Sequence, residues 1–136
     1  MKIRNHFINC VLAAVLVSLS TVSAMAEDAA PEALVLQKIM ADLGEAMQAV
    51  TDGISREDWP LVETSAASIA VHPTPPMSEK ARILAYMGTN MSQFKAHDNK
   101  THLAAVELGK RAEEKDGVQV IVAFAELQQT CLNCHQ

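Results

Sequence analysis

Apolar side chains recur along most of this chain at spacings of three and four residues, and no strand-like alternation of any length interrupts them. The spacings between residues 36 and 54 are typical of a helix that packs along one seam, with Pro31 tolerated in its first turn and Gly53 expected to end it. The seam positions are Leu36, Met40, Leu43, Met47, Val50 and Ile54.

The same helical pattern returns after this segment. Residues 55–58 resemble a capping box that starts a second helix, and the proline-rich residues 72–76 predict a loop. Ser78 begins a short helical stretch, a third main helix is expected over residues 91–115, and Asp116 can cap a fourth. The inward positions expected on the second and third helices are Trp59, Val62, Ala66, Ile69, Phe94, Thr101, Ala105, Leu108 and Ala112.

The last helical segment keeps the same spacing to the end of the sequence. Four amphipathic helices joined by short turns pack as an antiparallel four-helix bundle, so the expected fold class is all-α. Alanine, leucine and methionine are frequent and aromatic residues make up only 4% of the chain, which fits a helical bundle. The inward stripe of the fourth helix is Val120, Phe124, Leu127, Cys131 and Cys134.

The first residues have the composition of a secretory signal peptide. Lys2 and Arg4 precede an apolar run over residues 7–22, and small residues end at Ala26 in an A-x-A arrangement. A membrane anchor is the alternative, but the run is shorter than the ~20 apolar residues that a spanning helix needs. We therefore expect residues 1–26, including Cys10, to be removed on export to the periplasm, leaving a single domain over residues 27–136 without a membrane span.

Removal of the signal makes the protein more acidic. The whole chain has 11 Lys and Arg against 16 Asp and Glu, and two of the basic residues are Lys2 and Arg4. The mature domain therefore carries nine basic and sixteen acidic residues, a net charge of −7. An acidic domain of this size is not expected to bind nucleic acid, and it favours a protein partner with a basic docking patch.

A Cys-x-x-Cys-His run near the end of the chain carries the most specific chemistry. In an exported protein this run is typical of covalent c-type haem attachment. Cys131 and Cys134 are three residues apart, so on a helix their sulfurs share one face and can each form a thioether with a haem vinyl group. His135 follows directly and is placed to bind the iron from the proximal side. Two alternatives fit the sequence less well. A redox dithiol is expected near a βαβ pattern, and a zinc site needs four ligands, whereas the mature chain has no second cysteine pair.

With its Cys-x-x-Cys-His run on the last helix, the chain resembles the cytochrome c prime family over the whole of residues 27–136. The resemblance implies that haem c lies inside the bundle, held by the C-terminal helix. It also implies that Met40, in the segment 36–40, occupies the position over the distal face of the haem. The low-spin members of the family bind iron there through a methionine. At Leu36 the chain departs from the family, which usually has an arginine that pairs with a haem propionate.

Two functions remain open from the sequence. The first is one-electron transfer by a six-coordinate haem with His135 and Met40 as axial ligands, because a thioether suits haem iron in electron carriers. The second is binding or sensing of a small gas such as nitric oxide on five-coordinate iron. Nothing in the sequence supports an enzyme that turns over a substrate. The resemblance suggests a homodimer through the first two helices, while a monomer is equally consistent with the residues.

Overall fold

The computed structural model describes residues 34–136, and every regular element in that range is helical. The expected signal peptide (residues 1–26), its cleavage point and Pro31 lie outside the described residues. None of the helices in the described range is long and apolar enough to cross a membrane. The elements are α1 (Val35–Arg56), α2 (Trp59–Ala70), α3 (Met77–Met87), a single 3₁₀ turn η1 (Gly88–Asn90), α4 (Met91–Glu113) and α5 (Gly117–His135).

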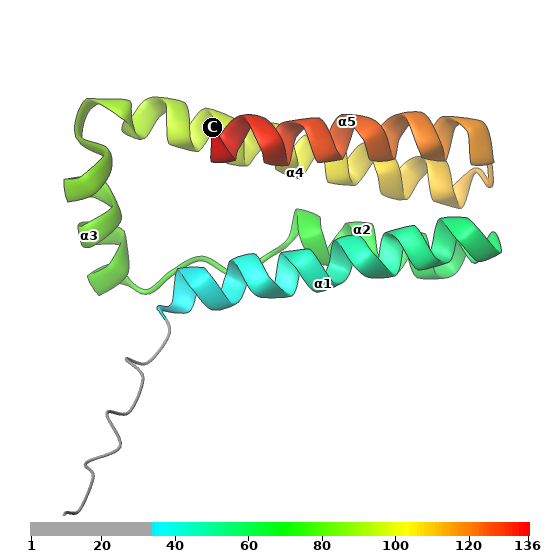
Figure 1. Cartoon of the computed structure of the whole chain (residues 1–136), viewed down its shortest axis with the longest axis horizontal. Coiled ribbons are helices and arrows are strands. Elements are labelled where there is room, and N and C mark those ends of the chain that lie inside the picture. Colours follow the sequence, from blue (N-terminus) through cyan, green and yellow to red (C-terminus); the bar gives the residue numbers. More distant parts are fainter. Residues whose placement is uncertain (1–33) are drawn as a thin grey trace, which may run out of the picture. The chain divides into compact units, whose positions relative to one another are not determined.

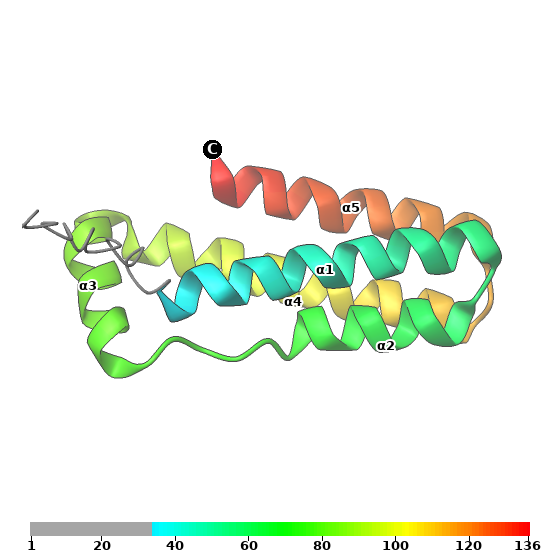
Figure 2. The same cartoon turned by 60° about the horizontal axis from the view of Figure 1, so that its bottom comes forward.

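The four long helices form two antiparallel pairs stacked on one another (Figures 1 and 2). The first pair is α1 with α2 and the second is α4 with α5, and the two pairs meet mainly where α2 packs against α4. Contacts between α1 and α5, by contrast, are few. The short helix α3 crosses one end of the two pairs (Figure 1). We call this end the α3 end, and the opposite end, where both tight turns lie, the turn end.

Fully buried side chains are concentrated toward the turn end. Only Val50 of α1 belongs to the main buried cluster, whereas α4 contributes four residues, three of them alanines. Small side chains on α4 allow α2 and α5 to approach it closely from two sides, as close packing of helices requires. The cluster consists of Val50, Val62, Ala66, Ile69, Ala104, Ala105, Leu108, Ala112, Val120, Ala123 and Leu127.

Asp116 caps α5 as expected, because its side chain accepts a hydrogen bond from the backbone N–H group of Gln119 (3.1 Å). The capping box expected over residues 55–58 is wrong, because the first two residues of that range end α1. Asp58 alone caps α2, by accepting a hydrogen bond from the backbone N–H group of Leu61 (3.2 Å). The expectation that Gly53 ends α1 is wrong, because α1 continues to Arg56 and ends only where Glu57 adopts a left-handed conformation, φ 54°.

The buried seam of α1 also differs from the expected one. Val50 is completely buried, but Met40 is 38% exposed, and the adjacent Ile39 is buried instead, with 2% exposed. Leu43 and Met47 are partly buried against the main cluster. A seam residue becomes buried only where another helix covers it, and toward the α3 end α1 has little contact with α5.

Gly53 has a packing role instead. A Cβ atom at this position would lie 2.8 Å from Cγ2 of Val62 and 3.2 Å from the carbonyl oxygen of Asp58. The missing side chain therefore lets the end of α1 approach the start of α2.

We expect Gly53→Ala to destabilise the protein by about 1–3 kcal/mol, the usual cost of overpacking a close contact. Gly109→Ala is the matched control, because a Cβ there meets Ala66 and Glu63 only at ordinary distances of 3.7 and 3.9 Å. That control should gain up to about 1 kcal/mol from higher helix propensity. Urea denaturation followed by circular dichroism measures both, and equal stability of the two variants would contradict the assignment.

Candidate functional site

The Cys-x-x-Cys-His run forms the last turns of α5, at the end of that helix that points toward α3 but stops short of it (Figure 1). Both cysteines are free thiols; Cys131 is half-buried and Cys134 is exposed. Because they are three residues apart within a continuous helix, the two sulfurs project from one side of α5, one turn apart. His135 is the last helical residue and its side chain is exposed.

The surroundings keep both thiols in the neutral form. Burial is the main cause that raises the pKa of Cys131, against a smaller lowering by its hydrogen bond with Thr130. Partial burial, followed by the negative charge of Asp98 on α4, raises the pKa of Cys134. Two protonated thiols differ from the low-pKa cysteines of redox dithiols, which are activated by nearby positive charge.

Cys131 and α1 share one apolar region. Cys131 packs against the main buried cluster, and so do Leu43 and Met47 of α1. Met40 lies one turn before Leu43 on α1, toward the α3 end, and is partly open to solvent. The sequence-predicted residues Cys131, Cys134, His135 and Met40 therefore all lie on α1 and α5 in the half of the bundle where full burial is rare.

Helix α3 is tied to the start of α1 by Glu79, a residue that the sequence analysis did not select. The backbone N–H groups of Val35 and Leu36 donate to the two carboxylate oxygens of Glu79, over 2.7 and 3.0 Å. The first turn of α1 contains no acidic residue, so Glu79 supplies both the acceptors and the negative charge that a helix N-terminus favours. The contact joins residues more than 40 positions apart and fixes the end of α1 that carries Met40.

Two histidines, His72 and His102, are partly buried and contact residues far from them in the sequence. Nε2 of His72 lies 3.3 Å from Oδ1 of Asp98, and its side chain is only 19% exposed. Nδ1 of His102 lies 2.7 Å from the carbonyl oxygen of Ala70. A carbonyl can only accept, so this nitrogen carries the proton and donates. Both histidines therefore join α4 to the end of α2 and the loop after it.

The donor set fits a covalently attached haem. Such a group needs two thiols on one helix face and a following imidazole, which α5 supplies; Cys131 also packs against the apolar cluster, whereas Cys134 and His135 are exposed. Within residues 34–136 no three His, Cys, Asp or Glu side chains gather as ligands for a bare metal ion. No protein-family model matches the chain, and a search of curated proteins also finds no match.

Substitution of Glu79 tests whether its carboxylate caps the N-terminus of α1. Glu79→Gln keeps the shape of the side chain but removes its charge, so α1 should lose about 0.3–1 kcal/mol of N-terminal stabilisation. The backbone amides of Val35 and Leu36 should then exchange with solvent faster, as measured by NMR hydrogen exchange. Arg82→Gln on the exposed side of the same helix is the control. Unchanged exchange at both amides in Glu79→Gln would contradict the cap.

Proposed function

We propose that this protein is an exported c-type cytochrome that transfers single electrons through one covalently attached haem. The observation that carries the proposal is the Cys-x-x-Cys-His run on the free end of α5, with both thiols accessible and neutral. An antiparallel helical bundle is a common scaffold for such a cofactor. The resemblance of the chain to the cytochrome c prime family supports the same proposal.

Each residue of the site has a distinct task in this proposal. Cys131 and Cys134 form the two thioether bonds, and His135 supplies the proximal imidazole nitrogen. Met40 offers a soft thioether from α1 on the distal side. When bound, the haem supplies an iron that alternates between the ferrous and ferric states. The apolar cluster against which Cys131 packs limits access of water to that side of the site.

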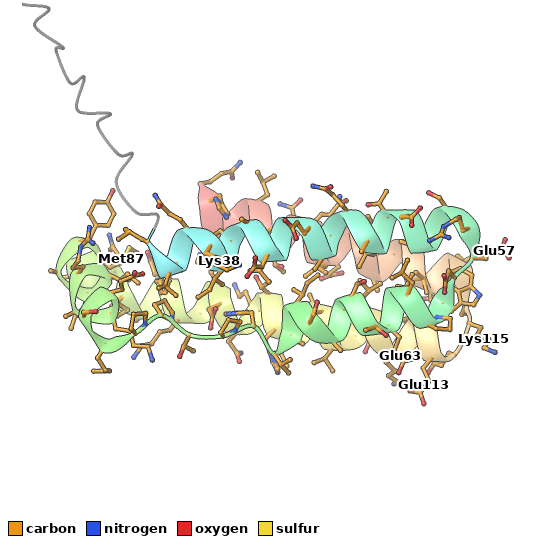
Figure 3. The ribbon with its side chains drawn as sticks, turned by 90° about the horizontal axis from the view of Figure 1, so that it is seen from below. Lys38, Glu57, Glu63, Met87, Glu113 and Lys115 are labelled. Atoms are coloured by element: carbon orange, nitrogen blue, oxygen red, sulfur yellow. The ribbon has the colours of Figure 1, made fainter. Side chains whose placement is uncertain are left out.

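The charges of the chain suit transient docking. The acidic mature domain attracts a partner with a basic patch over long range, which raises the encounter rate. Glu57, Glu63 and Glu113 lie near the turn end, where Lys115 lies as well, and Lys38 lies toward the α3 end (Figure 3). We infer that the net negative charge of the domain attracts the partner, while electrons pass near the last turn of α5. Export by the expected signal peptide would place this exchange in the periplasm.

A five-coordinate site that binds a small gas is the second candidate. It is favoured by the exposure of Met40, 38%, which is higher than a residue held firmly inside the bundle shows. If Met40 does not bind the iron, the distal side remains open to ligands such as nitric oxide or carbon monoxide.

Haem attachment is tested by intact mass. Protein exported from cells that contain a haem-attachment system should have the mass of residues 27–136 plus one haem, which reports signal cleavage and attachment together. The haem should stay with the protein in acidic organic solvent because thioethers are covalent. Cys131→Ala with Cys134→Ala is the control and should carry no attached haem. The mass of the bare mature chain in the wild type would contradict the proposal.

Distal ligation is tested by Met40→Leu. If Met40 binds the iron, the reduced wild type is six-coordinate and low-spin and binds carbon monoxide slowly. The variant should become five-coordinate and high-spin, bind carbon monoxide readily and have a lower reduction potential, because a thioether favours ferrous iron. Met47→Leu is the matched control, with an unchanged spectrum and a stability cost below about 1.5 kcal/mol. An unchanged spectrum in Met40→Leu would exclude this ligand and favour gas binding.

A further inference from the structure

An apolar hollow of about 720 Å³ lies at the turn end, beside the two tight turns of the bundle. Its apolar lining, which defines the turn-end hollow, consists of Ile54 of α1, Trp59 of α2, and Val118 and Ile121 of α5. Ile54 and Trp59 are half-buried and pack against the main buried cluster, whereas Val118 is 70% exposed and Ile121 is 57% exposed. Exposed apolar side chains that gather on one surface mark interaction sites, whereas scattered ones are normal.

The ring of Trp59 is held by a close approach of α5. A Cβ atom at Gly117 would lie 3.2 Å from Cη2 of the ring and 3.4 Å from Cζ2, so any side chain there would be crowded by the indole. The absence of that side chain lets the first turn of α5 lie against the edge of the ring. Trp59 therefore joins the starts of α2 and α5 and still lines the hollow. A large aromatic side chain held in this way is a typical anchor of protein interfaces.

The rim of the hollow is acidic. Its four charged residues are Glu57, Glu114 and Asp116, which are acidic, and Lys115, so three negative charges and one positive charge leave a net charge of −2. A groove of about 780 Å³ between α4 and α5 has no such bias, because two of its charged lining residues are basic and two are acidic. A surface complementary to the turn-end hollow has an apolar side chain flanked by lysines or arginines. A second copy of the chain is not complementary, because it would bring the same acidic rim against this one.

Two residues of the rim have side chains that the local backbone does not favour. Glu57 follows the end of α1 and Lys115 follows the end of α4, and both are left-handed, with φ of 54° and 56°. Glycine adopts this conformation after a helix without strain. Glycine at either position would therefore suit the fold better, but it would remove a charge beside the hollow. Figure 3 shows both residues at the turn end.

We propose that the turn-end hollow binds a basic segment of a partner protein, one apolar side chain of which packs against Trp59 and Val118. Lysines or arginines on either side of this anchor pair with the acidic rim, while Lys115 opposes them. Cys131 lies thirteen residues after Val118 on α5, about 20 Å away at a rise of about 1.5 Å per residue. A bound partner therefore leaves the cysteines uncovered, and the inference does not rest on the haem proposal.

NMR titration of the mature protein with short peptides tests this binding, because Trp59 supplies the only indole of the chain. The probes are a peptide with one leucine between two pairs of lysines, the same peptide with glutamates, and the lysine peptide with alanine in place of leucine. The Trp59 indole signal should shift with the first peptide and not with the second. Affinity for the alanine peptide should be at least about fivefold lower, since less apolar surface is buried. Added salt should weaken the complex by screening the charges.

Substitutions at the rim separate binding from folding. Glu57→Gly and Lys115→Gly should both raise the midpoint of urea unfolding, because glycine accepts the left-handed conformation. Their effects on affinity for the lysine peptide should be opposite: Glu57→Gly should weaken binding about twofold or more, and Lys115→Gly should tighten it by a similar factor. Val118→Asn should also weaken binding. Val122→Asn is its matched control, because Val122 is an exposed valine of the same helix (55%) that lies outside the hollow.

Several results would overturn the proposal. One is a Trp59 signal that does not shift with the lysine peptide, and another is equal affinity for the lysine and glutamate peptides. A Glu57→Gly protein that is more stable but binds the lysine peptide as tightly as the wild type would exclude the acidic rim from recognition. A Trp59 signal that shifts on dilution of the protein alone would assign the hollow to a second copy of the chain.

Discussion

The packing of α4 between α2 and α5 is the contact on which the rest of the fold depends. Ala104, Ala105 and Ala112 present almost no side-chain bulk, so two helices can approach the same helix closely from different directions. Close approach maximises dispersion contacts and excludes water along the whole seam. Helix α1 joins this unit mainly through α2, where the absence of a side chain at Gly53 allows a contact that no other residue would permit.

Because α1 and α5 have few contacts, the two halves of the bundle differ in how deeply their side chains are buried. Toward the turn end, α2, α4 and α5 together with Val50 of α1 bury a continuous apolar cluster that stabilises the domain. Toward the α3 end, α1 and α5 share few contacts, and the tie between α3 and α1 is made by the carboxylate of Glu79 rather than by a core. Groups that must remain accessible for chemistry belong in such a region, because full burial would close them off. The cysteines of α5 and Met40 of α1 lie in this half.

Local sequence was sufficient to predict the helices, the cap of α5 by Asp116, and the position of two cysteines and a histidine together on one helix. The spacing of apolar residues, a capping residue and the Cys-x-x-Cys-His run each act within one or two turns of chain. Local sequence did not predict that α1 passes through Gly53, that Ile39 rather than Met40 is buried, or that Glu79 and the pair of His72 with Asp98 join distant segments. These features depend on which helix covers which face, and that is set by contacts between residues far apart in the sequence. A periodic pattern predicts that the apolar face of a helix will be buried. Which helix covers that face depends on the packing of the whole bundle.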